Sequence, residues 1–127
     1  SAASQNLINN QTRWTAAGID NYEFVYQRIC FCPPKYTIPA LIEVRDGTVW
    51  SVEYQDSEIH LDAPDTTTFS TIPELFDVLT DAHERNAVKV NVTFNADLGY
   101  PEDADIDYAA NIVDEELRFT VTEFVRK

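Results

Sequence analysis

The chain contains no methionine, only three glycines and only two histidines among its 127 residues. With so few glycines it cannot build a glycine-rich phosphate loop or the G-x-S-x-G turn that presents a catalytic serine. His60 and His83 do not stand in an H-E-x-x-H or comparable zinc-binding spacing, and we interpret both as surface or helix-capping residues. These absences favour a protein that is not an enzyme, and we assign no catalytic residue. An active site assembled in space from distant residues would leave no such motif.

Basic residues are also scarce: Lys and Arg number 9 against 22 Asp and Glu, which gives a formal net charge of −13. Such a surface repels nucleic-acid phosphates and anionic lipid headgroups, so we expect neither as a partner. It attracts cations, either Ca²⁺ or a basic patch on a partner protein, although solubility in a salty medium is the simpler interpretation. Apolar runs are short, and none approaches the roughly 20 residues that a membrane-spanning helix needs. We therefore expect one domain over residues 1–127, with no insertion into a membrane.

The N-terminal segment carries the first predicted helix. Because methionine is absent, we expect either a processed mature protein or a trimmed chain, with residues 1–5 as a disordered spacer or the remnant of a tag. Within Gln5–Ala17, Leu7 and Trp14 belong to a weak apolar stripe at helical spacing. Gly18 then offers the left-handed conformation at which helices commonly end.

A strand over Asn21–Phe31, rich in aromatic and β-branched residues, leads into the only cysteine pair, Cys30 and Cys32. In an extended strand the two Cα atoms would lie near the limit of about 6.8 Å for an unstrained disulfide, so a bridge requires a bend, which Pro33-Pro34 could supply. A structural disulfide of an exported protein, two buried thiols, and a redox or soft-metal site are all open. The structural disulfide is favoured. The redox or soft-metal site is the least favoured, because no helix N-terminus and no further metal ligand are predicted beside the pair.

A β-hairpin is predicted in the sequence that follows. Thr37–Arg45 and Thr48–Tyr54 are both β-prone and flank Asp46-Gly47, a dipeptide that suits a type I′ turn because both central residues take positive φ. The resulting register places Glu43 opposite Trp50. Both faces of this hairpin carry apolar residues, so the sequence does not show which face meets the core.

A polar connection from Gln55 to Ser70 leads to the best-marked element of the chain, a second helix. Thr71 and Glu74 have the spacing of a capping box, in which each side chain satisfies a free backbone N–H of the first turn. Pro73 is tolerated in that turn. One face of the helix is apolar at helical spacing, through Ile72, Leu75, Phe76, Leu79 and Ala82.

Three more strands are predicted in the C-terminal third. From Val88 to Phe94, apolar and polar residues alternate strictly, which indicates a strand with one buried face. Ala104–Tyr108 and Leu117–Val121 alternate in the same way. The order of helices and strands, with hairpin-length connections, predicts an α+β fold. We expect a mostly antiparallel sheet of about five to six strands, with the N-terminal and central helices packed on one face.

An acidic segment near the C-terminus suggests a calcium site, since spaced carboxylates are what this cation binds. Counted as a calcium loop, Asp103, Asp105, Asp107 and Asp114 take the first, third, fifth and twelfth positions. Tyr108 then stands where the sharp turn of an EF-hand wants glycine, so an EF-hand is excluded. The same alternation fits a strand whose aspartates face solvent, which is the favoured interpretation, with irregular calcium binding as the alternative.

A set of short motifs is spread over nearly the whole chain: Trp14, Asn21-Tyr22-x-Phe24, Cys30-x-Cys32, Asp46-Gly47, Thr71-Ile72, Leu75-Phe76, Gly99-Tyr100-Pro101, Asp107 and Asp114-Glu115-Glu116. Through these motifs the chain resembles a bacterial family of uncharacterised exported lipoproteins that bears a domain-of-unknown-function label. The resemblance implies a location in the periplasm or cell envelope, with lipid anchoring through a segment that is not part of this chain. It also implies turn capping or binding for the last two motifs, and it supplies no activity, cofactor or catalytic residue.

The sequence therefore predicts an uncharacterised exported domain that is a binding or structural module rather than an enzyme. Its expected partner is an envelope protein with a basic surface, and its oligomeric state is open. One alternative is a calcium-binding module that uses the acidic segment over residues 103–116. The other is a thiol-redox protein that uses Cys30 and Cys32.

Overall fold

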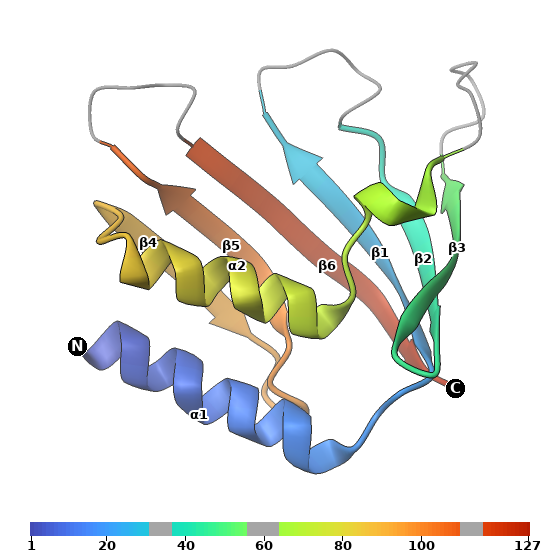
Figure 1. Cartoon of the computed structure of the whole chain (residues 1–127), viewed down its shortest axis with the longest axis horizontal. Coiled ribbons are helices and arrows are strands. Elements are labelled where there is room, and N and C mark those ends of the chain that lie inside the picture. Colours follow the sequence, from blue (N-terminus) through green and yellow to red (C-terminus); the bar gives the residue numbers. More distant parts are fainter. Residues whose placement is uncertain (31–36, 56–63, 110–115) are drawn as a thin grey trace.

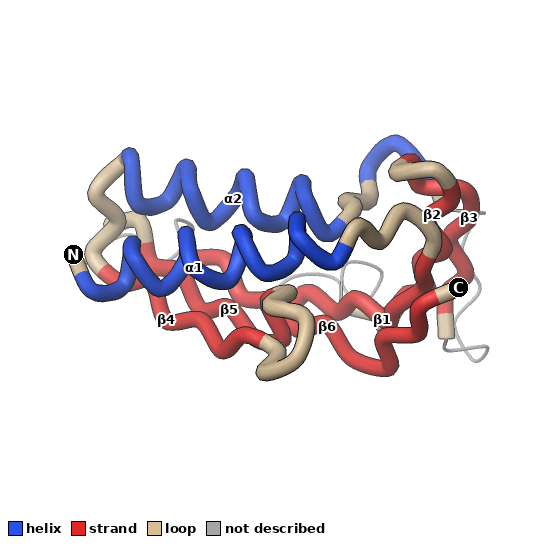
Figure 2. Tube along the Cα trace, turned by 90° about the horizontal axis from the view of Figure 1, so that it is seen from below, coloured by secondary structure: helices blue, strands red, loops and turns tan. Residues whose placement is uncertain are grey.

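The computed structural model describes residues 1–30, 37–55, 64–109 and 116–127. Its elements are α1 (Ala2–Ala17), β1 (Tyr22–Ile29), β2 (Ala40–Arg45), β3 (Thr48–Tyr54), the 3₁₀ turn η2 (Thr66–Thr68), α2 (Ile72–Glu84), β4 (Lys89–Phe94), β5 (Pro101–Asp107) and β6 (Glu116–Arg126). Among these residues, six strands form one sheet in which neighbouring strands are antiparallel. Both long helices cover one face of this sheet (Figures 1 and 2). The predicted α+β architecture is confirmed.

The strand order is β3-β2-β1-β6-β5-β4, so the first and last strands of the chain pair at the centre of the sheet. β3 and β4 lie at opposite edges, although they follow one another along the chain. α2 connects them and therefore crosses one face of the sheet (Figure 1). This topology leaves two edge strands, one on each side of the molecule.

α1 is longer than the sequence predicts. Residues 1–5, which were expected to be a disordered spacer, form its N-cap and first turn, because Ser1 and Ser4 make a capping box. The helix ends as predicted at Gly18, which takes φ 62° and ψ 38°. Leu7 and Trp14 lie on its buried face. No helix in the described part of the chain is both long enough and apolar enough to cross a membrane.

α2 begins with the predicted capping box. The Thr71 hydroxyl accepts a hydrogen bond from the Glu74 backbone N–H (3.3 Å), and the Glu74 carboxylate accepts one from the Thr71 N–H (3.0 Å). The buried hydroxyl of Tyr22 on β1 accepts a further bond from the Ile72 N–H (3.0 Å), and burial raises the pKa of Tyr22 to about 12. The start of α2 is thus held both by its own cap and by the central strand.

The β2–β3 hairpin turns at Asp46-Gly47 as predicted, with φ of 51° and 76°. The expected pairing of Glu43 with Trp50 is wrong, because a β-bulge shifts the register and places Glu43 opposite Ser51. Ile42 is fully buried, so the core face of β2 is the one that carries this side chain. Trp50 is 62% exposed.

Aromatic rings join α1 to the sheet. The ring of Trp14 meets those of Tyr22 and Phe124 nearly at right angles, with centroid distances of 5.3 and 5.7 Å. Tyr100, directly before β5, stacks on Phe124 at 4.5 Å. Edge-to-face and stacked pairs add to the burial of large rings. This cluster therefore fixes α1 against both halves of the sheet.

α1 also packs closely against the turn between β4 and β5. Gly99 in this turn has φ +85°, and a Cβ atom there would collide with the backbone oxygen of Asn10. The guanidinium of Arg13 donates a hydrogen bond to the Ala96 carbonyl oxygen (2.9 Å). Glycine thus permits an approach that any other residue would prevent, and the helix comes to lie alongside β4.

Candidate functional site

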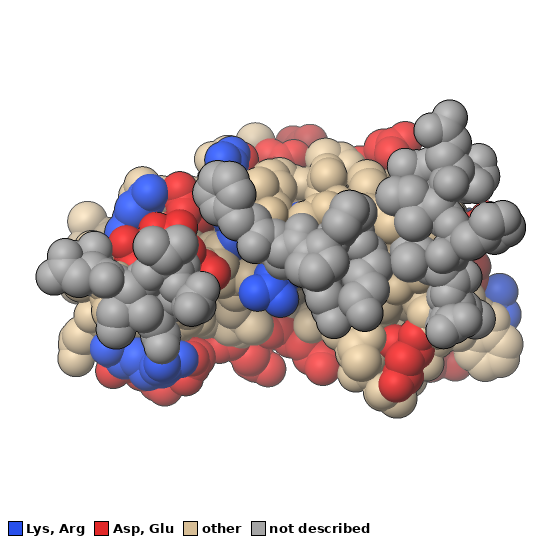
Figure 3. Space-filling model, turned by 90° about the horizontal axis from the view of Figure 1, so that it is seen from above, with Lys and Arg blue, Asp and Glu red and all other residues tan. Residues whose placement is uncertain are grey.

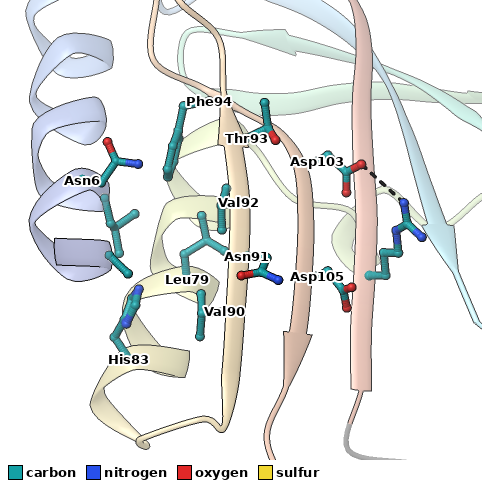
Figure 4. A pocket seen from close by; sticks show the side chains of 13 residues that line it. Asn6, Leu79, His83, Val90, Asn91, Val92, Thr93, Phe94, Asp103 and Asp105 are labelled. Carbon is teal, nitrogen blue, oxygen red and sulfur yellow. Dashed lines mark hydrogen bonds and ion pairs between the residues drawn. The ribbon is translucent and has the colours of Figure 1, made fainter. Parts of the chain in front are cut away.

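A groove of about 450 Å³ runs between α1 and the edge strand β4 and continues around that strand to the outer face of the sheet, opposite the two long helices (Figure 4). We call it the β4 groove. Five elements line it, namely α1, α2, β4, β5 and β6. The lining residues are Ala3, Asn6, Leu7, Leu79, His83, Val90, Asn91, Val92, Thr93, Phe94, Asp103, Asp105 and Arg118.

The inner side of the β4 groove, which faces the helices, is mainly apolar. Val90, Val92 and Phe94 alternate along β4 and are half-buried there, as the sequence pattern predicts. The Phe94 ring stacks on Phe76 of α2 with a centroid distance of 6.2 Å. Leu79 of α2 is fully buried behind them. The inner side can therefore accept apolar side chains without burying an unpaired polar group.

One end of the β4 groove is rich in amides. A neighbouring hollow of about 320 Å³ shares Asn6 and Phe94 with it and is also lined by Asn9, Asn10, Arg13, Asn95 and Ala96. The amide of Asn10 is buried and donates to the Asn6 backbone oxygen (2.9 Å) and side-chain oxygen (3.1 Å). Side-chain amides both donate and accept hydrogen bonds, which suits them to peptide groups of a bound chain.

The outer side of the β4 groove is charged. Ala104 and Ile106 of β5 are fully buried under the helices, so Asp103 and Asp105, which alternate with them, lie on the outer face. Asp105 accepts an ion pair from Lys89 of β4 (2.8 Å), and Arg118 of β6 lies 3.5 Å from Asp103.

Carboxylates outnumber cations on this part of the outer face. On the outer face, in line with Lys89, Asn91 and Thr93 of β4, the described acidic residues of β5 and β6 are Asp103, Asp105, Asp107 and Glu116. The basic residues there are Lys89 and Arg118. The hydrogen bond and charge of Asp105, with the charges of Glu116 and Asp107, raise the pKa of Lys89. Figure 3, a view from above, shows Lys and Arg atoms next to Asp and Glu atoms at the end of the molecule that holds β4. A bound cation therefore meets an excess of negative charge here.

The free edge of β4 borders the β4 groove from Val90 to Phe94. No segment in the described part of the chain pairs with this edge, which therefore presents unpaired backbone N–H and C=O groups. β4 contains no proline, and its pairing with β5 is regular from Lys89 to Thr93, with an irregularity only at Phe94. Such an edge can accept a further strand.

The calcium hypothesis is not tested by this geometry. Asp114 lies outside the described residues, and Asp107 accepts a hydrogen bond from the Ala109 backbone N–H (3.1 Å). Among the described residues, no three His, Cys, Asp or Glu side chains gather in a way that could hold a metal ion. Calcium binding by the segment over residues 103–116 stays a prediction.

The cysteine hypotheses also stay predictions. Cys30 directly follows the end of β1, whereas Cys32 lies outside the described residues. His60 lies outside them as well. His83 occupies the last turn of α2, where it is half-buried and lines the inner side of the β4 groove.

The β4 groove was not predicted from the sequence. The alternation from Val88 to Phe94 indicates a strand with one buried face, but it carries no information on which strands lie at the edges. α1 and β4 meet although about 80 residues separate them, and Asp103 and Arg118 meet across a connection outside the described residues. A hint was available in the sequence of β4, which lacks the proline that commonly protects an edge.

A model described as "Family of unknown function (DUF6174)" matches residues 6–126, from the first turns of α1 to the end of β6. No curated protein and no solved structure matches the chain. The family match includes every strand of the sheet and the whole lining of the β4 groove except Ala3. The chain belongs to this family of unknown function.

Proposed function

We propose that this domain is a non-enzymatic binding module that holds an extended segment of a partner polypeptide along β4. The observation that carries the proposal is the open edge of β4 with a groove beside it. An edge strand binds a further strand through backbone hydrogen bonds, while flanking pockets select side chains. The β4 groove supplies such flanks on both faces of the sheet.

The chemistry of the lining supports binding rather than catalysis. Among the residues that line the inner side, His83 is the one titratable residue. The others there have aliphatic, aromatic or amide side chains. On the outer side, Asp103 and Asp105 are engaged with Arg118 and Lys89. A nucleophile needs a general base within hydrogen-bonding reach, and these lining residues provide no such pair.

The proposal includes an exported location, in the periplasm or cell envelope, with lipid anchoring through a segment outside this chain. It rests on the resemblance to exported lipoproteins given above and on the net charge of −13, which suits a partner with a basic surface. An envelope protein is the expected partner.

Site-specific photocrosslinking in cells that express the protein tests this function. A photoreactive amino acid replaces Asn91, which is exposed on β4, or, as a matched control, Ser51, which is exposed on the other edge strand, β3. We expect a discrete adduct with one envelope protein from position 91 and none from position 51. Adducts of equal yield at both positions, or none at position 91, would refute the proposal.

A further inference from the structure

We infer that the segment held by β4 is a strand in which apolar side chains alternate with lysine or arginine. This inference rests on the proposed function and adds the chemistry of the partner. It follows from the two faces of the β4 groove, which differ in character and would each contact every second residue of a docked strand.

The backbone N–H and C=O groups of β4 point alternately toward β5 and toward the free edge. The Asn95 backbone N–H donates to the Tyr100 oxygen (2.8 Å) where the β4–β5 turn begins. The irregularity between Thr93 and Phe94 has its extra residue, Glu102, on β5, so the alternation along β4 is unbroken. Backbone groups of successive strand residues point alternately to the two sides, so those of Asn91, four residues before Asn95, also face β5. Those of Val90 and Val92 then face the free edge. A docked strand would bond to these two residues.

The inner positions of the docked strand must be apolar. A residue that exchanges hydrogen bonds with Val92 has its side chain on the same face of the sheet as Val92. That side chain enters the inner side of the β4 groove, between α1 and β4, where Val90, Phe94 and Leu79 line it. Ala3 leaves room at the helix wall because its side chain is a single methyl group.

The outer positions of the docked strand lie beside Asn91 and Thr93, next to the charged outer side. Lys and Arg side chains are long enough to reach past β4 to Asp103 and Asp105 on the next strand. Carboxylates outnumber cations there, so a cation is attracted and a carboxylate is repelled.

A second copy of this chain is a poorer occupant than a basic partner. Each chain carries a net charge of −13, so two copies repel one another as they approach. In an edge-to-edge dimer the same outer carboxylates would also lie close to their counterparts.

β4 has six residues, so the docked segment is about six residues long, or roughly 20 Å.

Peptide binding measured by fluorescence anisotropy at about 0.15 M salt tests the inference. The probe is a capped peptide of alternating lysine and valine. One control peptide has glutamate in place of lysine, and a second keeps the lysines but has proline at its central valine, which prevents strand pairing. We expect the lysine–valine peptide to bind at least about tenfold more tightly than either control.

Two variants on one helix provide the matched control. Ala3→Trp fills the inner side of the β4 groove, whereas Ala16→Trp places the same ring at an exposed position of α1 outside the groove. We expect Ala3→Trp to weaken binding of the lysine–valine peptide about tenfold and Ala16→Trp to leave it unchanged. Circular dichroism confirms that both variants are folded.

Each result has a separate meaning. Equal binding of the lysine and glutamate peptides overturns the basic partner but leaves strand addition standing. Equal binding of the proline peptide, or an unchanged affinity in Ala3→Trp, overturns docking of this alternating basic and apolar strand in the β4 groove. Absence of binding by all three peptides also overturns the inference. A position-91 adduct in the photocrosslinking experiment would in each case preserve the proposed function.

Discussion

The two edge strands of the sheet differ in how well they are protected from pairing with a further strand. At β3 a β-bulge interrupts the pairing with β2, η2 packs against the strand, and the rings of Tyr54 and Phe69 meet with a centroid distance of 6.4 Å. Arg45 lies over the exposed ring of Trp50 at 4.6 Å. At β4 no described segment covers the edge, and the pairing is regular over most of the strand. Bulges and covering segments protect an edge from pairing, so β4 is the less protected of the two edges.

The largest expected effect comes from the turns that close the two edge hairpins. Gly99→Ala places a Cβ against the Asn10 oxygen at a positive φ, so we expect a loss of about 3 kcal/mol of unfolding free energy. Gly47→Ala also has a positive φ, but its Cβ would meet nothing within 4 Å, so we expect a loss of about 1 kcal/mol. Urea denaturation measures both. Equal losses would show that α1 does not depend on Gly99 to lie beside β4.

The aromatic residues of the two edge strands give the next contrast. Phe94→Ala removes the half-buried ring that stacks on Phe76, and we expect a loss of about 2 kcal/mol. Trp50→Ala removes a ring that is 62% exposed, and we expect a loss below about 1 kcal/mol. Thermal and urea unfolding of both variants check the difference. A larger loss for Trp50→Ala would mean that the β3 edge contributes more to stability than the β4 edge.

Local signals in the sequence were sufficient for most elements. The Thr71 and Glu74 capping box, the Asp46-Gly47 turn and the alternation in β4 each depend on residues a few positions apart, and the structure confirms all three. The start of α1 was missed because its cap uses two serines, a weaker signal than the Thr and Glu of α2.

What the sequence did not show depends on residues far apart. The edge position of β4 follows from the pairing of β1 with β6 at the centre of the sheet, and about 90 residues separate these strands. No local pattern specifies such a pairing. The bulge at Trp50 also escaped prediction, because Asp46-Gly47 alone implies a regular register. The candidate site is therefore a product of topology, while its apolar inner side is a product of local alternation.

A positive charge introduced on each edge strand tests whether peptide binding depends on β4 and not on β3, with little change in stability. Asn91→Lys on β4 and Ser51→Lys on β3 both alter exposed residues, so we expect unfolding free energies within about 0.5 kcal/mol of the wild type. Asn91→Lys adds a positive charge beside Asp103 and Asp105, so we expect the affinity for the lysine–valine peptide to fall about threefold. Ser51→Lys should leave it unchanged. Anisotropy titrations decide, and an equal decrease in both variants would point to a general charge effect rather than to binding at β4.

The smallest expected effect concerns η2, which packs against β3. The carboxylate of Asp65 accepts hydrogen bonds from the Thr67 hydroxyl (2.7 Å) and backbone N–H (2.9 Å), and these bonds lower its pKa below the usual 3.8. A carboxyl group with a lowered folded-state pKa stabilises the fold above its unfolded pKa, and this contribution is lost as the pH falls through the folded value. We therefore expect Asp65→Asn to lower the Tm slightly at pH 7, and we expect its Tm to be closer to that of the wild type below pH 3.8.

The control variant Thr67→Val removes the hydroxyl but keeps the N–H, so its Tm should show only part of this pH-dependent decrease. A difference in Tm that is the same at both pH values would mean that the charge of Asp65 does not help to hold η2 over the β3 edge.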